Sequence, residues 1–189
     1  MNGPSLIGIT LVLAQSVLAT TFVMAAVQKA RATEVFAAGL AAFGIPRNLR
    51  RAGTRLLIAC ELVVAALMLS SGITAIIGFA LCSTMLIAFS AVLVRSMVSG
   101  VPAECNCFGA GSMPISAAEL SRNIALFIVA ISGGLIAIAF AGSFPSALDS
   151  IVAALKGGNP TSLAVATAGV ALALVWSQLP QIVALVRLE

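Results

Sequence analysis

The sequence contains no histidine and no tyrosine, and only 8% of its 189 residues are charged. The missing histidines exclude imidazole metal ligands and histidine general bases, and the missing tyrosines exclude phenolic donors. Soluble domains carry roughly 25% charged residues, so this composition is not that of a soluble domain. The reactive groups that remain are four cysteines, six acidic residues and ten basic residues.

The chain is instead rich in apolar residues, which make up 61% of it and give a mean hydropathy of +1.16. A bilayer core is crossed by roughly 20 apolar helical residues, and several uncharged runs have that length. We predict an all-α membrane protein, a polytopic helical bundle with a four-helix core plus a fifth transmembrane helix. A single domain, residues 1–189, has spans at residues 5–27, 53–69, 73–94, 118–141 and 162–179. The first run lacks a basic flank and a cleavage site, so we interpret it as a span of the mature protein.

Local signals define the connections between the spans. Residues 56–94 contain one charged residue and would form a helix about 58 Å long, twice a bilayer, so the chain must fold back at residues 70–72. Residues 33–43 are apolar on one side, which suggests a short helix at the membrane interface or an ordinary connecting helix. Ser116 and Glu119 match a capping box, which predicts the start of the fourth span.

The basic residues gather on one side of the predicted membrane. We call this side of the membrane side A. It holds the connection between the first and second spans, the connection between the third and fourth spans, and the C-terminus. Because the basic excess lies at helix ends, it indicates membrane topology and not a nucleic-acid partner, and by itself it places side A in the cytoplasm. Side B has only Lys156, whereas side A has Lys29, Arg31, Arg47, Arg50, Arg51, Arg55, Arg95, Arg122 and Arg187.

Glu61 is a carboxylate within a predicted span. This placement costs a few kcal/mol unless the group is paired, protonated or next to a wet cavity. One interpretation makes Glu61 a proton acceptor or ligand contact beside Cys60, and the other an ion pair with Lys29 or Arg122 that holds helices together. The two interpretations are compatible, because a paired carboxylate next to a thiol can also accept its proton.

Cys105 and Cys107 are separated by one residue in a predicted side A loop. A disulfide between them would close a very small ring, and strained disulfides are easier to reduce, which favours exchange over stapling. Two close thiolates could instead bind a soft ion such as Cu(I) or Hg(II), or the residues could be unrelated loop cysteines. Phe108, Gly109 and Gly111 leave a partner protein little obstruction on its way to the sulfurs.

The other two cysteines lie within predicted spans. Cys60 is expected roughly 8 Å into the membrane from side A, where it could meet the loop pair, and Cys82 about 20 Å deep. A buried free cysteine commonly behaves as a small inert hydrophobe, and this applies most to Cys82. A thiolate is the attacking species, so a cation such as Lys29 or Arg122 beside Cys60 would assist it.

Three motifs occur together in this chain: a first span that ends at residues 22–29, a second span with Cys60 and Glu61, and a Cys-x-Cys-Phe-Gly loop followed by residues 121–123. With these motifs the sequence resembles the methylamine-utilisation membrane protein MauE family and the wider MauE/DoxX group. The likeness covers most of the chain and is strongest over residues 22–127. Cys60 and Cys82 are not matched with confidence to the family pattern.

The resemblance implies a redox-associated membrane protein that works with a thioredoxin-like partner to form or rearrange disulfides of an envelope client protein. Cys105 and Cys107 would be the exchanging pair, with Lys29, Glu61 and Arg122 as the polar cluster behind them. By analogy of fold, quinone-coupled disulfide-forming membrane enzymes are similar in outline, which makes a quinone the candidate electron acceptor, although the sequence has no quinone signature.

Disulfide-forming chemistry belongs on the oxidising face of a membrane, whereas the charge count places the loop pair on the cytoplasmic face. We favour an outer-face site in the inner (cytoplasmic) membrane, because interfacial arginines loosen the charge rule; otherwise the protein would take electrons from cytoplasmic thiols. Two other classes of function remain open. One is a soft-metal carrier that uses the same cysteines, and the other a structural membrane subunit that anchors another complex.

Overall fold

The structure, a computed structural model, describes residues 6–99, 117–140, 152, 164 and 167–174. This part of the chain is helical and contains no strand. Its elements are α1 (Leu6–Arg31), α2 (Thr33–Gly39), the 3-10 helix η1 (Leu40–Phe43), α3 (Arg47–Met68), α4 (Gly72–Ser99) and α5 (Ala117–Ala139). The all-α class predicted from the sequence is therefore confirmed.

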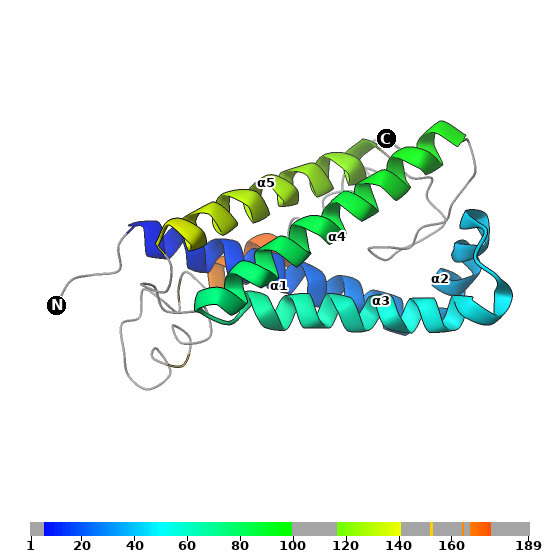
Figure 1. Ribbon diagram of the computed structural model, residues 1–189, viewed down its shortest axis with the longest axis horizontal. Coiled ribbons are helices and arrows are strands. Elements are labelled where there is room, and N and C mark those ends of the chain that lie inside the picture. The colour runs from blue at the N-terminus through cyan, green and yellow to red at the C-terminus, as the bar shows by residue number, and fades with distance from the viewer. Residues whose placement is uncertain (1–5, 100–116, 141–151, 153–163, 165–166, 175–189) are drawn as a thin grey trace, which may run out of the picture.

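The four long helices form a ring in which each packs against two others. Their main contacts join α1 to α3, α3 to α4, α4 to α5, and α5 back to α1. Successive long helices run in opposite directions, so the end of α1, the start of α3, the end of α4 and the start of α5 share one end of the bundle (Figure 1). We call it the α2 end, because α2 lies there and packs against α3.

Two glycines with positive φ stand at element boundaries where the sequence predicted breaks. Gly72, with φ of 62°, is the last residue of the predicted turn at residues 70–72 and the first residue of α4, and Gly44, with φ of 76°, caps the end of η1. A residue with a Cβ rarely adopts this backbone conformation. The short helix expected over residues 33–43 is present as α2 followed by η1. Helix α5 begins next to the predicted capping box, whose Ser116 lies outside the described residues.

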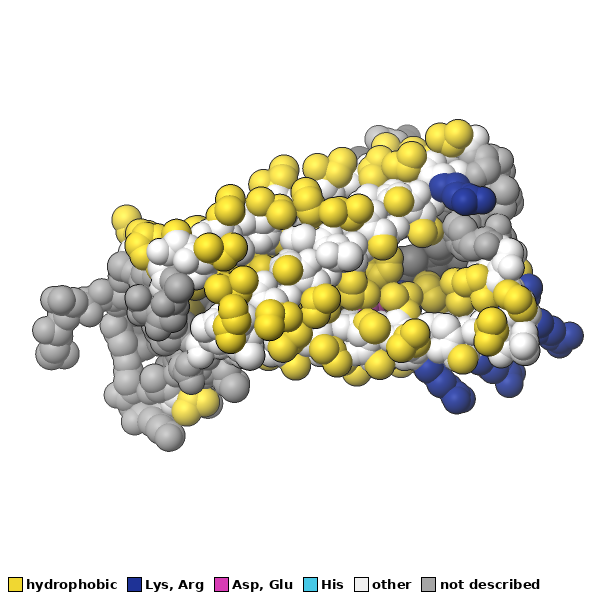
Figure 2. All heavy atoms as spheres, in the orientation of Figure 1, with side chains coloured by type: hydrophobic (Ala, Val, Ile, Leu, Met, Phe, Trp, Pro, Cys, Tyr) yellow, Lys and Arg dark blue, Asp and Glu magenta, His cyan; other side chains and the backbone are white. Residues whose placement is uncertain are grey.

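The bundle has an apolar interior and an apolar exterior. Leu18, Met68 and Leu86 are at most 1% exposed, while Leu56, Ile128 and Leu135 are more than 60% exposed. Figure 2 shows hydrophobic side chains along the length of this face and the arginines confined to the α2 end. A surface of this kind is expected where lipid replaces water around the helices.

Three described helices are long and apolar enough to cross a membrane: α1, α4 and α5. The protein is therefore a multi-pass membrane protein. Helix α3, predicted as the second span, is a 22-residue helix, but its last 18 residues still contain Arg51, Arg55 and Glu61. Half of the predicted fifth span lies outside the described residues, and in the described half Gly169 packs against Ser16 of α1. The four-plus-one arrangement of transmembrane helices thus stays a prediction.

Small residues let α4 and α5 approach closely. A Cβ placed on Gly133 would lie 2.6 Å from Cε1 of Phe79, and one on Gly134 would lie 3.3 Å from Cβ of Phe79. The Phe79 ring therefore occupies space that any larger residue at position 133 would need. Glycine serves this purpose in membrane helices, where association depends on packing instead of on expulsion of water.

We predict that Gly133→Ala destabilises the folded protein by about 1–3 kcal/mol, because the new methyl group overlaps a ring enclosed in the core. The midpoint of thermal unfolding in detergent would report the loss. Gly53→Ala is the matched control, since its new Cβ meets only Leu40, at 3.8 Å, and alanine favours a helix. Equal midpoints for Gly133→Ala and the parent would contradict the role assigned to this glycine.

Candidate functional site

A buried ion pair joins the last turn of α1 to the middle of α3. Nζ of Lys29 donates a hydrogen bond to Oε1 of Glu61 at 2.6 Å, and the two side chains are 1% and 0% exposed. Both charges have left water, which is costly for each alone, and their mutual attraction offsets part of that cost. The pair therefore holds α1 against α3 only as long as both partners are present.

Two aromatic rings flank the Lys29 ammonium group. Nζ lies 5.6 Å from the ring centre of Phe36 in α2 and 5.5 Å from that of Phe89 in α4. At these distances the negative face of a ring attracts a cation, most strongly where water is excluded. The site thus joins four elements, α1, α2, α3 and α4, around one positive charge.

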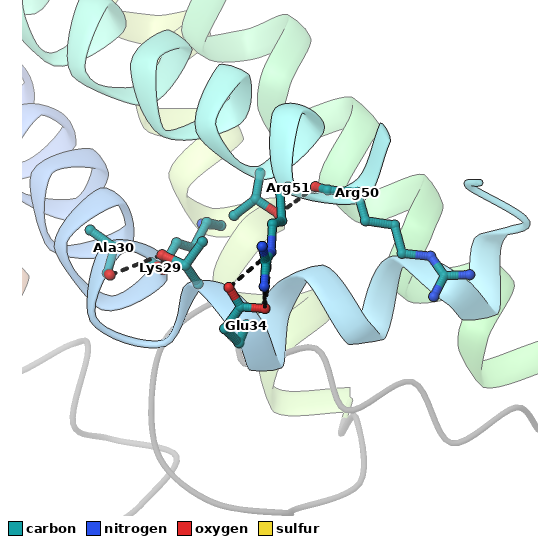
Figure 3. A network of polar contacts seen from close by, with 7 residues as sticks. Lys29, Ala30, Glu34, Arg50 and Arg51 are labelled. Atoms are coloured by element: carbon teal, nitrogen blue, oxygen red, sulfur yellow. Dashed lines mark hydrogen bonds and ion pairs between the residues drawn. The ribbon is translucent and has the colours of Figure 1, made fainter. Parts of the chain in front are cut away.

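The junction between α1 and α2 sets the position of Phe36. The Thr33 hydroxyl donates to the main-chain carbonyls of Lys29, at 3.1 Å, and Ala30, at 3.0 Å. Arg51 of α3 forms an exposed ion pair with Glu34 of α2, and its Nη2 donates to Oε2 at 3.0 Å (Figure 3). These contacts fix α2 across the end of α1, so that the Phe36 ring faces inward over Lys29.

The two oxygens of the Glu61 carboxylate differ in their hydrogen bonding. Oε2 is buried, and no donor among the described residues hydrogen-bonds to it. Buried carboxylate oxygens normally have a donor, and each missing one costs free energy. This oxygen is therefore available to accept a proton or a hydrogen bond from a group that enters the site.

Helix α5 contributes further buried polar side chains near its start. Arg122 is 5% exposed and Asn123 is 1% exposed. Because α5 starts at the α2 end of the bundle, both residues belong to the same end as the Lys29–Glu61 pair (Figure 1). The family resemblance implied that Arg122 belongs to the polar cluster; the structure buries its side chain at this end of the bundle, and its role in the cluster stays a prediction.

The structure describes two of the four cysteines, and these two differ in burial. Cys60 is exposed although its neighbour Glu61 is fully buried, since adjacent residues on a helix point about 100° apart. Cys60 therefore does not share the interior face of α3 with the ion pair. Cys82 is completely buried among core residues of α4, and burial of this kind suits an inert thiol. Cys105 and Cys107 lie outside the described residues.

The sequence predictions did not include several residues of the interior. Phe36 and Phe89, the rings beside Lys29, have no sequence signal that separates them from the other seven phenylalanines. Gln15 and Asn123 did have a signal, because both are amide side chains within long apolar runs, where polar groups are expensive. Both are 1% exposed, and Gln15 donates from Nε2 to the carbonyl of Ser70 at 3.2 Å.

Within the described ranges, no three side chains of histidine, cysteine, aspartate or glutamate come together as metal ligands. The described site combines a cation, a carboxylate with one oxygen that has no donor among the described residues, and two aromatic faces, and both charged side chains are buried. Burial makes the electrostatic interactions between such groups stronger than they would be at a surface.

Residues 7–139 match the protein family described as "Methylamine utilisation protein MauE". The matched range begins in α1 and ends with the last residue of α5, so it contains all four long helices and the ion pair. No match was found among curated proteins or among solved structures.

Proposed function

The chain belongs to the MauE family of methylamine utilisation proteins, and from this premise we propose that it exchanges disulfides between envelope proteins and a thioredoxin-like partner. Cys105 and Cys107 are the exchanging pair in this proposal. The observation that carries it is the buried Lys29–Glu61 pair, which leaves one carboxylate oxygen without a donor among the described residues. A buried polar atom without a hydrogen-bond partner is uncommon, and this oxygen is therefore the one assigned a chemical role.

The connectivity of the bundle supports this pairing of loop and site. The segment that contains both cysteines leaves α4 after Ser99 and enters α5 at Ala117, both at the α2 end (Figure 1). Phe89, which flanks Lys29, precedes Ser99 by ten residues, or about 15 Å of helix. Six residues lead from Ser99 to Cys105, and an extended chain of that length spans about 20 Å. The loop is therefore long enough for a sulfur to approach the ion pair.

The site offers what thiol–disulfide exchange needs. The attacking species is a thiolate, and a positive charge nearby favours it over the thiol. The Lys29 ammonium supplies that charge, and Oε2 of Glu61 can accept the proton that a thiol gives up. The rings of Phe36 and Phe89 exclude water from the ammonium group, which strengthens its effect on a sulfur.

The reaction is balanced without a further reagent. A thiolate of the client attacks the disulfide between Cys105 and Cys107, a mixed disulfide forms, and one loop cysteine leaves as a thiolate. The second client thiolate then attacks the mixed disulfide, so the client becomes oxidised and the loop pair becomes a dithiol that takes up the two client protons. The disulfide of the thioredoxin-like partner reoxidises the loop pair by the same two steps in reverse.

We assign the loop to the outer face of the inner membrane, where disulfides persist. The arginines at the α2 end then contact lipid headgroups instead of marking the cytoplasmic side. A quinone in the membrane is the proposed final acceptor of the two electrons in place of the partner disulfide, in which case one quinone would become one quinol. No described residue is assigned to that quinone.

The test is a redox titration of the four cysteines. The purified protein is equilibrated in glutathione buffers of stepped potential and alkylated, and each cysteine is scored by mass. We expect Cys105 and Cys107 to be oxidised together in one two-electron transition. Cys60, which is exposed, should stay alkylatable at every potential, and Cys82, which is buried, should show no redox transition. In intact cells, a membrane-impermeant maleimide should label the reduced pair.

Two outcomes would count against this function. A pair that remains reduced at every potential cannot exchange disulfides, and labelling only after the membrane is opened would place the loop in the cytoplasm. Stoichiometric Cu(I) or Hg(II) bound by the parent and lost on Cys107→Ser would favour the soft-metal carrier instead.

A further inference from the structure

A groove of about 470 Å³ lies between α2 and the first turns of α3, at the end of the bundle and outside the ion-pair site. Its walls are the side chains of both helices. It is lined by Glu34, Ala37, Ala38, Arg47, Asn48, Arg50 and Arg51. Three arginines against one glutamate give this lining a net charge of +2. The groove is therefore suited to an anion, and we propose that it binds the phosphate headgroup of an anionic membrane lipid.

The arginines are crowded on one helix in a way that favours a bound anion. Arg47 and Arg51, which both line the groove, are four residues apart, so like charges are neighbours along α3. They also stand near the positive end of the helix dipole, and the first turn of α3 contains no acidic residue. Both arrangements are unfavourable by themselves. A phosphate in the groove would reduce the repulsion between the arginines and also their repulsion by the helix dipole.

The protein itself compensates only part of this charge. Glu34 pairs with Arg51, but the pair is exposed to solvent, with exposed fractions of 70% for Glu34 and 68% for Arg51. Arg50 donates from Nε to the carbonyl of Ile45 at 2.8 Å, and its guanidinium group extends away from the Arg51–Glu34 pair (Figure 3). Guanidinium groups bind phosphate oxygens in a fork of parallel hydrogen bonds, so the remaining donors suit a phosphate.

Apolar side chains on the same elements favour a lipid over free phosphate. Leu49, Leu56 and Val63 follow one another at intervals of seven residues and are all more than half exposed, so they form an apolar stripe along α3. Val35, next to Glu34 on α2, is also 46% exposed. An anionic lipid could place its phosphate at the arginines and its acyl chains along such side chains, whereas a free phosphate ion would gain nothing from them.

The proposal is tested by lipid binding to the purified protein. Phosphatidylglycerol is titrated into the detergent-solubilised protein, and the bound lipid is counted by native mass spectrometry, with phosphatidylcholine as the uncharged comparison. Each arginine near an anionic surface contributes about a factor of five in affinity, so Arg47→Gln combined with Arg51→Gln should weaken phosphatidylglycerol binding at least tenfold. Raised salt should weaken binding to the parent.

The matched control is Arg55→Gln, because Arg55 is an exposed arginine of the same helix that does not line the groove. Its binding should change less than twofold. Thermal unfolding without added lipid verifies that all variants are folded. The proposal would be overturned if phosphatidylcholine bound as well as phosphatidylglycerol, or if Arg55→Gln lost as much binding as the double variant. It would also be overturned if inorganic phosphate bound to the protein as well as phosphatidylglycerol did. The redox titration of the cysteines is independent of this result.

Discussion

Lys29→Met is expected to lower the free energy of unfolding by about 3–5 kcal/mol, because it leaves the Glu61 carboxylate buried without its counter-charge. Unfolding by titration with a denaturing detergent, followed by the loss of helical circular dichroism, would measure the difference. Glu61→Gln should cost less. In that variant the lysine retains the rings of Phe36 and Phe89 at 5.6 Å and 5.5 Å, and these attract a cation.

The double variant Lys29→Met with Glu61→Leu separates charge from packing. Replacement of a whole buried ion pair by apolar residues of similar volume is often neutral or stabilising, so the double variant should recover most of the stability that Lys29→Met alone loses. If it were as unstable as Lys29→Met, shape and not charge would dominate the site. The same double variant should slow disulfide exchange, because the ammonium group that favours the thiolate is absent.

Cys107→Ser or Cys105→Ser is expected to abolish disulfide exchange, lowering its rate to that of the uncatalysed background. One of the two variants should also accumulate a mixed disulfide with a thioredoxin whose own resolving cysteine is serine, because the second thiolate that would release it is missing. Non-reducing electrophoresis followed by mass identification of the joined peptides would detect this species.

Cys82→Ser is the control for the cysteine variants, since Cys82 is fully buried in the core and lies outside the proposed reaction. It should exchange disulfides at the parental rate and trap no partner. Cys60→Ser tests whether the exposed thiol of α3 takes part in the exchange. If this variant lost exchange while the loop variants kept it, the Cys60 thiol would have to be the reacting group.

Much of the helical framework could be predicted from the sequence, because long apolar runs and turn residues act locally. The turn at residues 70–72, the helix over residues 33–43 and the start of α5 all agree with their sequence signals. The second membrane span was predicted over residues 53–69, and the helix that contains most of it, α3, begins earlier, at Arg47. A hydropathy pattern detects the part of a helix that faces lipid. It misses the charged first turns of α3, which extend beyond the membrane core and pack against α2.

The sequence by itself determined that Glu61 needs compensation, since a carboxylate within an apolar run is costly wherever the helix packs. Only the tertiary structure decided that Lys29 provides it, that Phe36 and Phe89 flank the ammonium group, and that Cys60 points away from the pair. The physical reason is that the composition of a helix fixes which groups must be buried, whereas their partners depend on how distant helices rotate and pack. Those rotations are set by contacts spread over the whole bundle, such as Gly133 against Phe79, and no single stretch of sequence contains them.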